Sequence, residues 1–328
     1  APVGGDPAAY KDAIFLSPHK FIGGPSTPGV LIARRELFGN RVPVVPGGGT
    51  VAYVNPEDHA FVTDAAHREE GGTPAIIESV RAGLVFQLKE AVGVETIRAH
   101  EERLLSRAVE AWRAEPAIEI LGNLDAPRLS IVSFVVRAPS GHWLHHNFVV
   151  ALLNDLFGVQ ARGGCSCAGP YGHRLLGIDI ERSHEFEREI TGGCEGIKPG
   201  WVRVNFNYFI SDTVADYVVD AVRLVARDGW RLLGDYIFDP ETGRWRHRDG
   251  VVEPPIRLGA ISYADDGSRR VPRTDNRGGE ELLAQHLADG AAILAAAIPP
   301  DLGSHASGLS DDFEHLLWFD LPTGALGS

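Results

Sequence analysis

The stretch that decides the fold is Ser17-Pro18-His19-Lys20-Phe21-Ile22-Gly23-Gly24-Pro25, near the start of the 328-residue chain. Short apolar runs at 13–16 and 29–33 enclose it, so we expect a strand, a Gly/Pro-rich turn and a second strand. A lysine just past a strand end, beside a hydroxyl and an imidazole, presents a reactive amine next to groups that bind anions. The alternative is a solvated loop lysine, which is the usual state of this residue type.

Composition limits the classes to which the protein can belong. The formal net charge is −13 and no basic stripe offsets it, which argues against a nucleic-acid partner. No 18-residue uncharged apolar run is present, so we expect no membrane span. Three cysteines in so long a chain fit reduced thiols in a cytoplasmic protein better than a disulfide framework. Only four of the 31 lysine and arginine residues are lysines. A lysine in a chain so rich in arginine is a candidate for amine chemistry, which a guanidinium cannot perform.

Apolar spacing predicts the secondary structure of the remaining chain. We expect helices over 94–112, 146–157, 213–224 and 280–298, and strands over 118–121, 129–136 and 202–206. A further helix is expected to begin at Thr73, with Thr73 as the N-cap and Pro74 as the first helical residue. Residues 236–245 are expected to form a hairpin that turns at Pro-Glu-Thr-Gly. Near the end of the chain, 313–319 mixes acidic residues with aromatic side chains that we expect to be exposed.

The phrase around Lys20 resembles the motif that carries the pyridoxal 5'-phosphate (PLP) lysine in class V aminotransferases and cysteine desulfurases. The resemblance implies that Lys20 forms the Schiff base with PLP, and that Ser17 and His19 bind the PLP phosphate. Glu70-Gly71-Gly72-Thr73-Pro74 resembles the family's Glu-Ala-Gly-Thr-Pro segment, so Thr73 is implied to reach the phosphate of the partner subunit's PLP. That role is compatible with an N-cap, because helix N-termini bind anions.

A second informative phrase is Arg162-Gly163-Gly164-Cys165-Ser166-Cys167-Ala168-Gly169-Pro170. It resembles the Arg-x-Gly-x-x-Cys-Ala-x-Pro loop of the second group of cysteine desulfurases. The match implies that Cys167 forms the persulfide, with Arg162 and His173 as the positive charges that favour its thiolate. Two other interpretations stay open. Cys165, Cys167, Cys194 and a histidine could bind zinc, although their spacing is poor for it, or the cysteines could be small inert core residues.

Arg203, in Gly200-Trp201-Val202-Arg203-Val204-Asn205, lies at the start of a predicted strand. It resembles the arginine that binds the substrate α-carboxylate in the same family. A planar guanidinium binds a carboxylate through two parallel hydrogen bonds, which suits this role. The alternative is an ordinary surface salt bridge.

Taken along the chain, the resemblance implies an α/β fold that ends in a small α+β domain. Residues 1–95 are expected to be the remainder of the PLP-binding large domain, 96–235 the small C-terminal domain and 236–328 an accessory C-terminal extension. The family's N-terminal half, which holds an aspartate that pairs with the PLP ring nitrogen, has no counterpart before residue 12. The chain also has no methionine, so we expect an N-terminally truncated fragment.

The expected function is that of a PLP-dependent enzyme acting on an amino acid. Cysteine desulfurase chemistry, in which L-cysteine gives L-alanine and an enzyme persulfide, is the first expectation. A homodimer and a sulfur-acceptor protein are the implied partners. Where the family often has two histidines, Cys167 is preceded by Cys165 and Ser166, so a class V aminotransferase, lyase or epimerase is the alternative. An inactive fragment is the non-enzymatic alternative.

Overall fold

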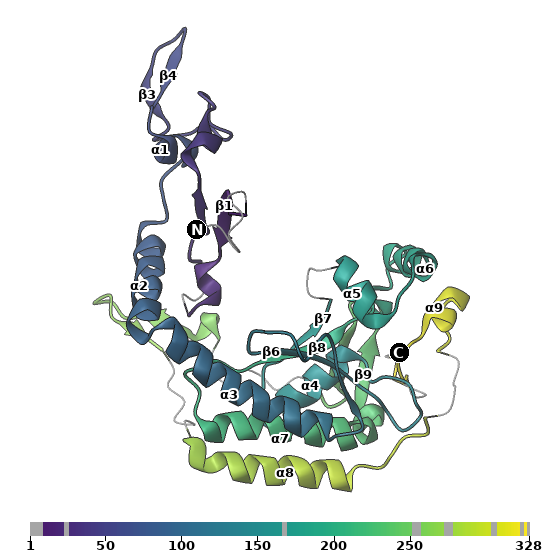
Figure 1. Ribbon diagram of the computed structural model, residues 1–328. Helices are drawn as coiled ribbons and strands as arrows, with labels where there is room; N and C mark the ends of the chain where they lie inside the picture. Colours follow the sequence, from purple (N-terminus) through teal and green to yellow (C-terminus); the bar gives the residue numbers. More distant parts are fainter. Residues whose placement is uncertain are drawn as a thin grey trace. The chain divides into compact units, whose positions relative to one another are not determined.

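The structure is a computed structural model that describes residues 9–22, 26–165, 169–250, 257–271, 278–302, 307–321 and 325–326. The chain forms two compact units, Ala1–Ile97 and Arg98–Ser328 (Figure 1). The second unit includes residues 236–328, which the sequence predicts to be an accessory extension. Within the described residues, no helix combines the length and apolar character needed to cross a bilayer.

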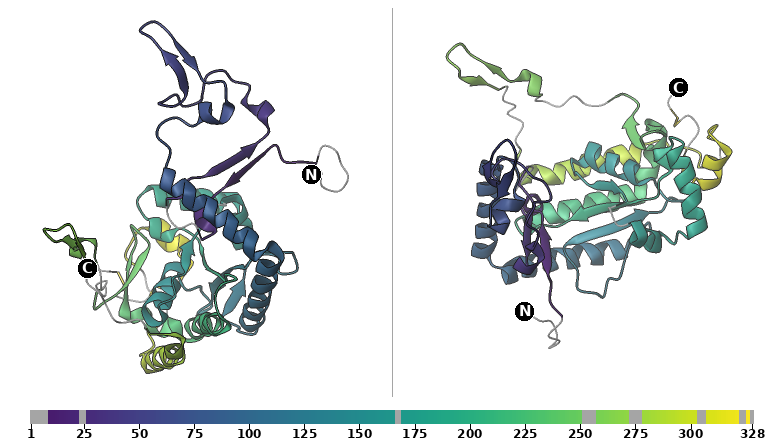
Figure 2. Two further views of the ribbon diagram at one scale, coloured as in Figure 1. Left: turned by 90° about the vertical axis from the view of Figure 1, so that its left-hand side faces the viewer. Right: turned by 90° about the horizontal axis from the view of Figure 1, so that it is seen from above.

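The first unit is built on two antiparallel strand pairs. β1 (Ala13–Leu16) pairs with β2 (Val30–Ala33) in the register Ala13↔Ala33 to Leu16↔Val30, which confirms the two predicted strands (Figure 2), while residues 23–25 of the predicted turn lie outside the described residues. β3 (Val51–Val54) and β4 (His59–Phe61) form the other pair. The helical elements of this unit are η1 (Pro18–Lys20), η2 (Arg35–Phe38), α1 (Ala65–Glu69) and α2 (Ile76–Val92).

Apolar side chains of the first unit remain open to solvent. Phe15 on β1 is 80% exposed and Ile32 on β2 is 54% exposed, so neither strand is covered on these positions. Large apolar residues along α2 are also exposed, namely Ile76, Ile77, Val80, Leu84 and Leu88. An apolar surface of this extent is typical of an interaction surface.

The predicted start of the helix at Thr73 is wrong, because α2 begins at Ile76 and Ala75 takes the N-cap position. Gly72 N–H donates to Gly48 O at 2.8 Å, which ties the chain just before Thr73 to the neighbouring loop. The first helical hydrogen bond runs from Ser79 N–H to Ala75 O. Thr73 is therefore exposed and belongs to the loop.

The second unit contains a four-stranded antiparallel sheet in the order β5-β6-β8-β7. Its strands are β5 (Ile118–Ile120), β6 (Ile131–Val136), β7 (Arg162–Gly164) and β8 (Trp201–Asn205). Helices α3 (Val94–Arg113), α4 (His146–Phe157) and α7 (Asp212–Asp228) pack on one face of it (Figure 1). The core is filled by alternate strand residues such as Val132, Phe134 and Val202, because side chains alternate between the two faces of a strand.

Most predicted elements of the second unit are confirmed. α4 spans the predicted residues, and β6, β8, α3 and α7 lie within a few residues of their predicted bounds. The sequence reading missed α5 (Gly169–Leu176) and α6 (Ile180–Thr191). These two short helices lie on the side of the sheet opposite α7 (Figure 1).

The C-terminal segment packs into the same core. β9 (Tyr236–Asp239) and β10 (Arg244–His247) form the predicted hairpin, and α8 (Leu283–Ala296) lies inside the predicted helix. The remaining elements are η3 (Glu195–Ile197), η4 (Gly229–Asp235), η5 (Leu258–Ala260), β11 (Ser262–Tyr263), β12 (Arg269–Arg270), η6 (Glu280–Leu282) and α9 (Asp311–Leu316).

The prediction of exposed aromatics at 313–319 is wrong for Phe313 and Phe319, which are both 0% exposed. α9 turns its apolar side inward, and Phe319 forms a bridge with Trp143. Phe319 is buried because it pairs with Trp143, which is distant in the sequence. The acidic residues next to Phe319 in the sequence do not indicate this contact.

Candidate functional site

Lys20 is the last residue of η1, the single turn that follows β1. Lys20 N–H donates to Ser17 O at 2.9 Å, so one tight turn carries Ser17, His19 and Lys20. Pro18 is buried in this turn, whereas the side chains of His19 and Lys20 are exposed. The turn is therefore fixed through its backbone and leaves the amine and imidazole free for a ligand.

Phe21 anchors this turn on α2. Its ring meets Phe86 edge to face, with centroids 5.7 Å apart, and the Lys89 ammonium lies 5.5 Å from the centroid of the Phe21 ring. Such aromatic and cation–π contacts each contribute about 0.5–1 kcal/mol. They position Lys20 relative to α2 without using its amine.

Two glycine runs meet beside Thr73. A Cβ on Gly71 would lie 2.7 Å from Val45 O, and one on Gly47 would lie 3.2 Å from Gly72 N. Only glycine allows the two backbones to approach so closely. The exposed Thr73 leaves this junction with its hydroxyl open to solvent.

The groups that these two loops present fit PLP. The cofactor has an aldehyde, which an amine can bind covalently, and a dianionic phosphate, which hydroxyl and imidazole groups bind. Lys20 would supply the amine and Ser17 and His19 the phosphate-binding groups, while the exposed Thr73 would offer a hydroxyl to the phosphate of the partner subunit's PLP. All four lie in the first unit, and the close glycine contact forms a backbone junction that a Cβ would disrupt.

Arg203 lies in the middle of β8, directly opposite Ser133 on β6 and Arg162 on β7. Residues that face each other across antiparallel strands point to the same face, so the two arginines are neighbours. Val202 and Val204 point to the other face, into the core. Among the residues that the structure describes, neither arginine forms an ion pair, so the surface salt bridge weighed for Arg203 is not seen there. Two adjacent like charges favour an anionic ligand.

The predicted nucleophile Cys167 lies outside the described residues. Cys165, at the end of β7, is described and half-buried. With Lys198, it lines a mainly apolar cavity of about 330 Å³ between α5, α6 and the start of β8. The same two residues also line a smaller cavity of about 150 Å³ on the side of α4 and the β9–β10 turn.

The other cysteine-loop residues fall in different places. Arg162 is exposed on β7, while His173 lines the larger cavity with Cys165. The His173 ring nitrogens lie 2.8 Å from Gly169 O and 2.8 Å from Ser183 Oγ, which joins α5 to α6.

The third cysteine has a different character. Burial, followed by the hydrogen bond with Glu189 and its charge, raises the pKa of Cys194 and so disfavours its thiolate. Within the described part of the chain, no group of three or more His, Cys, Asp or Glu side chains is placed to hold a metal ion. The contacts of Cys194 thus resemble those of a structural cysteine.

Two residues that the sequence reading missed, His145 and His146, border the smaller cavity. Their rings stack with centroids 4.2 Å apart at the start of α4. Burial lowers the pKa of His146 to about 3, and it also lowers the pKa of His145 well below its usual value. His145 Nδ1 accepts a hydrogen bond from Asn147 N–H, so its Nε2–H donates to Gly196 O. Both rings are therefore neutral. The only feature of the sequence that could have indicated this pair is two adjacent histidines at the start of a helix.

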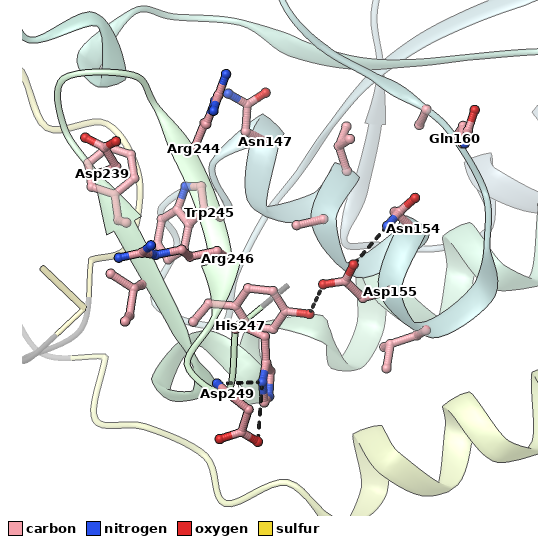
Figure 3. Close-up of a pocket in the computed structure, with 18 of the residues that line it drawn as sticks. Asn147, Asn154, Asp155, Gln160, Asp239, Arg244, Trp245, Arg246, His247 and Asp249 are labelled. Atoms are coloured by element: carbon pink, nitrogen blue, oxygen red, sulfur yellow. Dashed lines mark hydrogen bonds and ion pairs between the residues drawn. The ribbon is translucent and has the colours of Figure 1, made fainter. Parts of the chain in front are cut away.

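A further cavity, an open groove of about 1520 Å³, is lined by residues of α4 and of the β9–β10 hairpin (Figure 3). At its wall, the Tyr236 hydroxyl donates to Asp155 Oδ2 at 2.8 Å, and Asn154 donates to the other carboxylate oxygen. Burial raises the pKa of Tyr236, and the nearby Asp155 charge adds to this shift. None of the predicted site residues lines this groove, so it is not part of the candidate site.

Parts of the chain are similar to known proteins. A family model described as aminotransferase class-V matches residues 8–183. A probable cysteine desulfurase of Halobacterium salinarum is 30% identical over 175 residues, which cover 53% of this chain and 40% of the relative. A second, from Mycobacterium leprae, is 34% identical over 165 residues, which cover 50% of this chain and 38% of the relative. The chain thus spans about 40% of the length of these curated relatives.

Among solved structures, the apo cysteine desulfurase of Thermococcus onnurineus NA1 has a similar fold. The TM-score is 0.52 at 26% identity, over 66% of this chain and 47% of that protein. This likeness confirms the α/β fold class expected from the sequence.

Proposed function

Because the chain belongs to the class V aminotransferase family, we propose that it is the PLP-anchoring and substrate-binding part of a cysteine desulfurase-like enzyme. The observation that carries the proposal is the turn that presents Lys20 together with Ser17 and His19, directly after β1. The reaction would convert L-cysteine to L-alanine and leave a persulfide on the enzyme. The names of the relatives from Halobacterium salinarum and Mycobacterium leprae support this choice.

Each predicted site residue of the first unit would have a separate role. Lys20 would hold PLP through its amine and, once the amino acid has displaced it, would move the proton at the substrate Cα. Ser17 and His19 would bind the phosphate, and Thr73 would bind the phosphate in the partner subunit. When bound, PLP supplies an electron sink for the bonds at Cα.

The second unit would bind and attack the substrate. Arg203 would hold the α-carboxylate, since its guanidinium has no ion-pair partner among the described residues. The thiolate of Cys167 would attack the substrate sulfur, forming an S–S bond as the Cβ–S bond breaks. The electron pair of the broken bond stays on the alanine carbon, which then takes up a proton.

The two loop cysteines give the decisive test of this reaction. Serine at position 167 keeps the shape of the side chain but is far less nucleophilic at neutral pH. In the complete protein that contains this chain, Cys167→Ser should keep the PLP absorbance and cysteine binding yet abolish alanine formation, while Cys165→Ser should cost much less. If Cys165→Ser is the inactive variant, the assignment of the nucleophile is wrong. If neither substitution matters, transamination, β-elimination or epimerisation of another amino acid replaces the proposal.

The proposed assembly is a cytoplasmic C2 homodimer, because Thr73 is expected to serve the partner's cofactor. The exposed apolar positions of α2 offer a surface for such contacts. Sedimentation of the PLP-loaded protein tests this directly. A fully active monomer would exclude it.

A further inference from the structure

The segment from Tyr236 onward lies outside the family match, which ends at residue 183, and the sequence predicts that it is accessory. Its contacts point to a different role. The turn of the β9–β10 hairpin packs on η3, the short helical turn at Glu195–Ile197 that leads into β8. Since β8 carries Arg203, this contact reaches the candidate site through the backbone.

The contact between the hairpin and η3 is tight at Gly196. Gly196 N–H donates to Pro240 O at 2.8 Å. A Cβ on Gly196 would lie 2.5 Å from Phe238 Cζ, 2.8 Å from Pro240 O and 3.2 Å from Gly243 Cα. Real Cβ atoms do not approach backbone and ring atoms so closely, so the fit requires glycine at this position.

A second contact comes from the far end of the chain. Trp318 Nε1–H donates to Ile197 O at 2.9 Å, and His145 Nε2–H donates to Gly196 O at 3.1 Å. The Trp318 ring stacks on both His145 and His146, with centroids 5.4 Å and 5.8 Å away. Two successive carbonyls of η3 therefore accept hydrogen bonds from side chains.

The hairpin turn also borders the cavity beside the cysteine loop. Thr242 and Gly243 line the cavity of about 150 Å³ together with Cys165 and Lys198. Lys198 follows η3 directly and its ammonium lies 3.6 Å from Glu195 Oε2 on η3, so its place in the wall of this cavity depends on how η3 is held. Residues beyond 236 thus contribute both a wall of this cavity and the support of its neighbouring segment.

We propose that the described part of the segment from Tyr236 onward is a positioning element of the active site: through its hairpin turn and Trp318 it fixes η3, and thereby places Lys198 in the wall of the cavity that Cys165 also lines and orients β8, which carries Arg203. The catalytic meaning of this role rests on the proposed function. The positioning itself can be measured without it.

Two tryptophans of this segment provide a matched test. Trp318→Phe keeps an aromatic ring on the histidines but removes the hydrogen bond to Ile197 O. Trp245→Phe changes a more deeply buried ring, 7% exposed, whose Nε1 has no hydrogen-bond partner in the described structure. Hydrogen exchange of the 195–205 amides should accelerate about five-fold in Trp318→Phe, as expected for the loss of one hydrogen bond, and remain unchanged in Trp245→Phe.

Steady-state kinetics of the complete, PLP-loaded protein provide a second measurement. A purely structural role of Trp318 would not change KM while leaving kcat unaffected. Trp318→Phe should raise KM for L-cysteine about five-fold and leave kcat within about two-fold, because Arg203 binds the carboxylate before and during the reaction. Trp245→Phe should leave both constants unchanged. If the two variants accelerate exchange at 195–205 equally, or if neither does, the positioning role is overturned.

A second pair protects the test against misfolding of a tryptophan variant. Gly196→Ala, which the hairpin leaves no room for, should accelerate exchange at 195–205 more than Trp318→Phe. Gly259→Ala adds a Cβ with no atom within 4 Å and should have no such effect. If L-cysteine is not consumed at all, the proposed function fails, and the exchange measurements alone then decide whether the segment positions η3.

Discussion

Lowering the pH should destabilise the second unit through its buried histidine pair. The His146 side chain is 6% exposed, and burial lowers its pKa from 6.5 to about 3 in the folded protein. In the unfolded chain the ring is solvated and titrates near 6.5. Below that pH the unfolded state takes up a proton that the folded state excludes, so the free energy of unfolding falls. The loss begins near pH 6.5, grows as pH decreases and ends near pH 3, where the folded form also binds the proton.

The magnitude follows from linkage. Each pH unit between the two pKa values costs about 1.4 kcal/mol, so His146 should lower the free energy of unfolding by about 2 kcal/mol at pH 5. His145 adds to the loss in the same direction, because its pKa is also lowered by burial. Stability at pH 7.5 should be unaffected, since both rings are neutral there in the folded and unfolded states.

Urea unfolding followed by tryptophan fluorescence measures this effect selectively, because all six tryptophans lie in the second unit. The free energy of unfolding is compared at pH 7.5 and pH 5.0. In His146→Gln the difference between the two values should be about 2 kcal/mol smaller than in the unaltered protein. His286→Gln, at an exposed position of α8, controls for the loss of one histidine and should leave the difference unchanged. An unaltered difference in His146→Gln would refute the argument.

Three further predictions use other contacts. Arg203→Lys should raise KM for the amino-acid substrate more than about ten-fold in steady-state assays, because an ammonium cannot form the two parallel hydrogen bonds of a guanidinium. Tyr236→Phe should lower the free energy of unfolding in urea by about 1–2 kcal/mol, since it removes the hydrogen bond to Asp155. Gly93→Ala should cost about 1–3 kcal/mol in urea unfolding followed by far-UV circular dichroism, which also reports on the helices of the first unit, because φ is +87° there, whereas Gly83→Ala inside α2 should be neutral or stabilising. Equal stabilities for the two alanine variants would contradict the last prediction.

Local periodicity predicted the elements whose burial follows a regular pattern. α4 has Phe148, Val149, Leu152 and Leu153 inside, which is the spacing of a helix with one buried face. α6 was missed because Phe186 is its only buried residue, although Asp179 before it is a recognisable N-cap. β7 consists of Arg162, Gly163 and Gly164, and only its pairing with β8 makes it a strand.

Some features of the candidate site could likewise be predicted from the sequence, and others could not. The Lys20 turn could be predicted because its chemical groups are adjacent in the sequence and follow a strand. The burial of His145 could not be predicted from the sequence. Its ring is enclosed by Phe238, Trp245 and Phe319, which lie more than ninety positions further along the chain. For the same reason the sequence suggested an accessory role for the C-terminal segment, whose aromatic side chains meet α4 only in the folded unit.

The proposed reaction requires groups from both units, since Lys20 belongs to the first and Arg203 to the second. α2 and α3 follow one another with Gly93 alone between them, and the boundary between the two units lies further on, at Ile97 and Arg98 within α3. The backbone there has φ +87° and ψ +137°, a conformation that side chains other than glycine rarely adopt, and a Cβ would meet only Thr96 Oγ1, at 3.9 Å. Conformational preference rather than packing therefore sets the course of the chain at this residue.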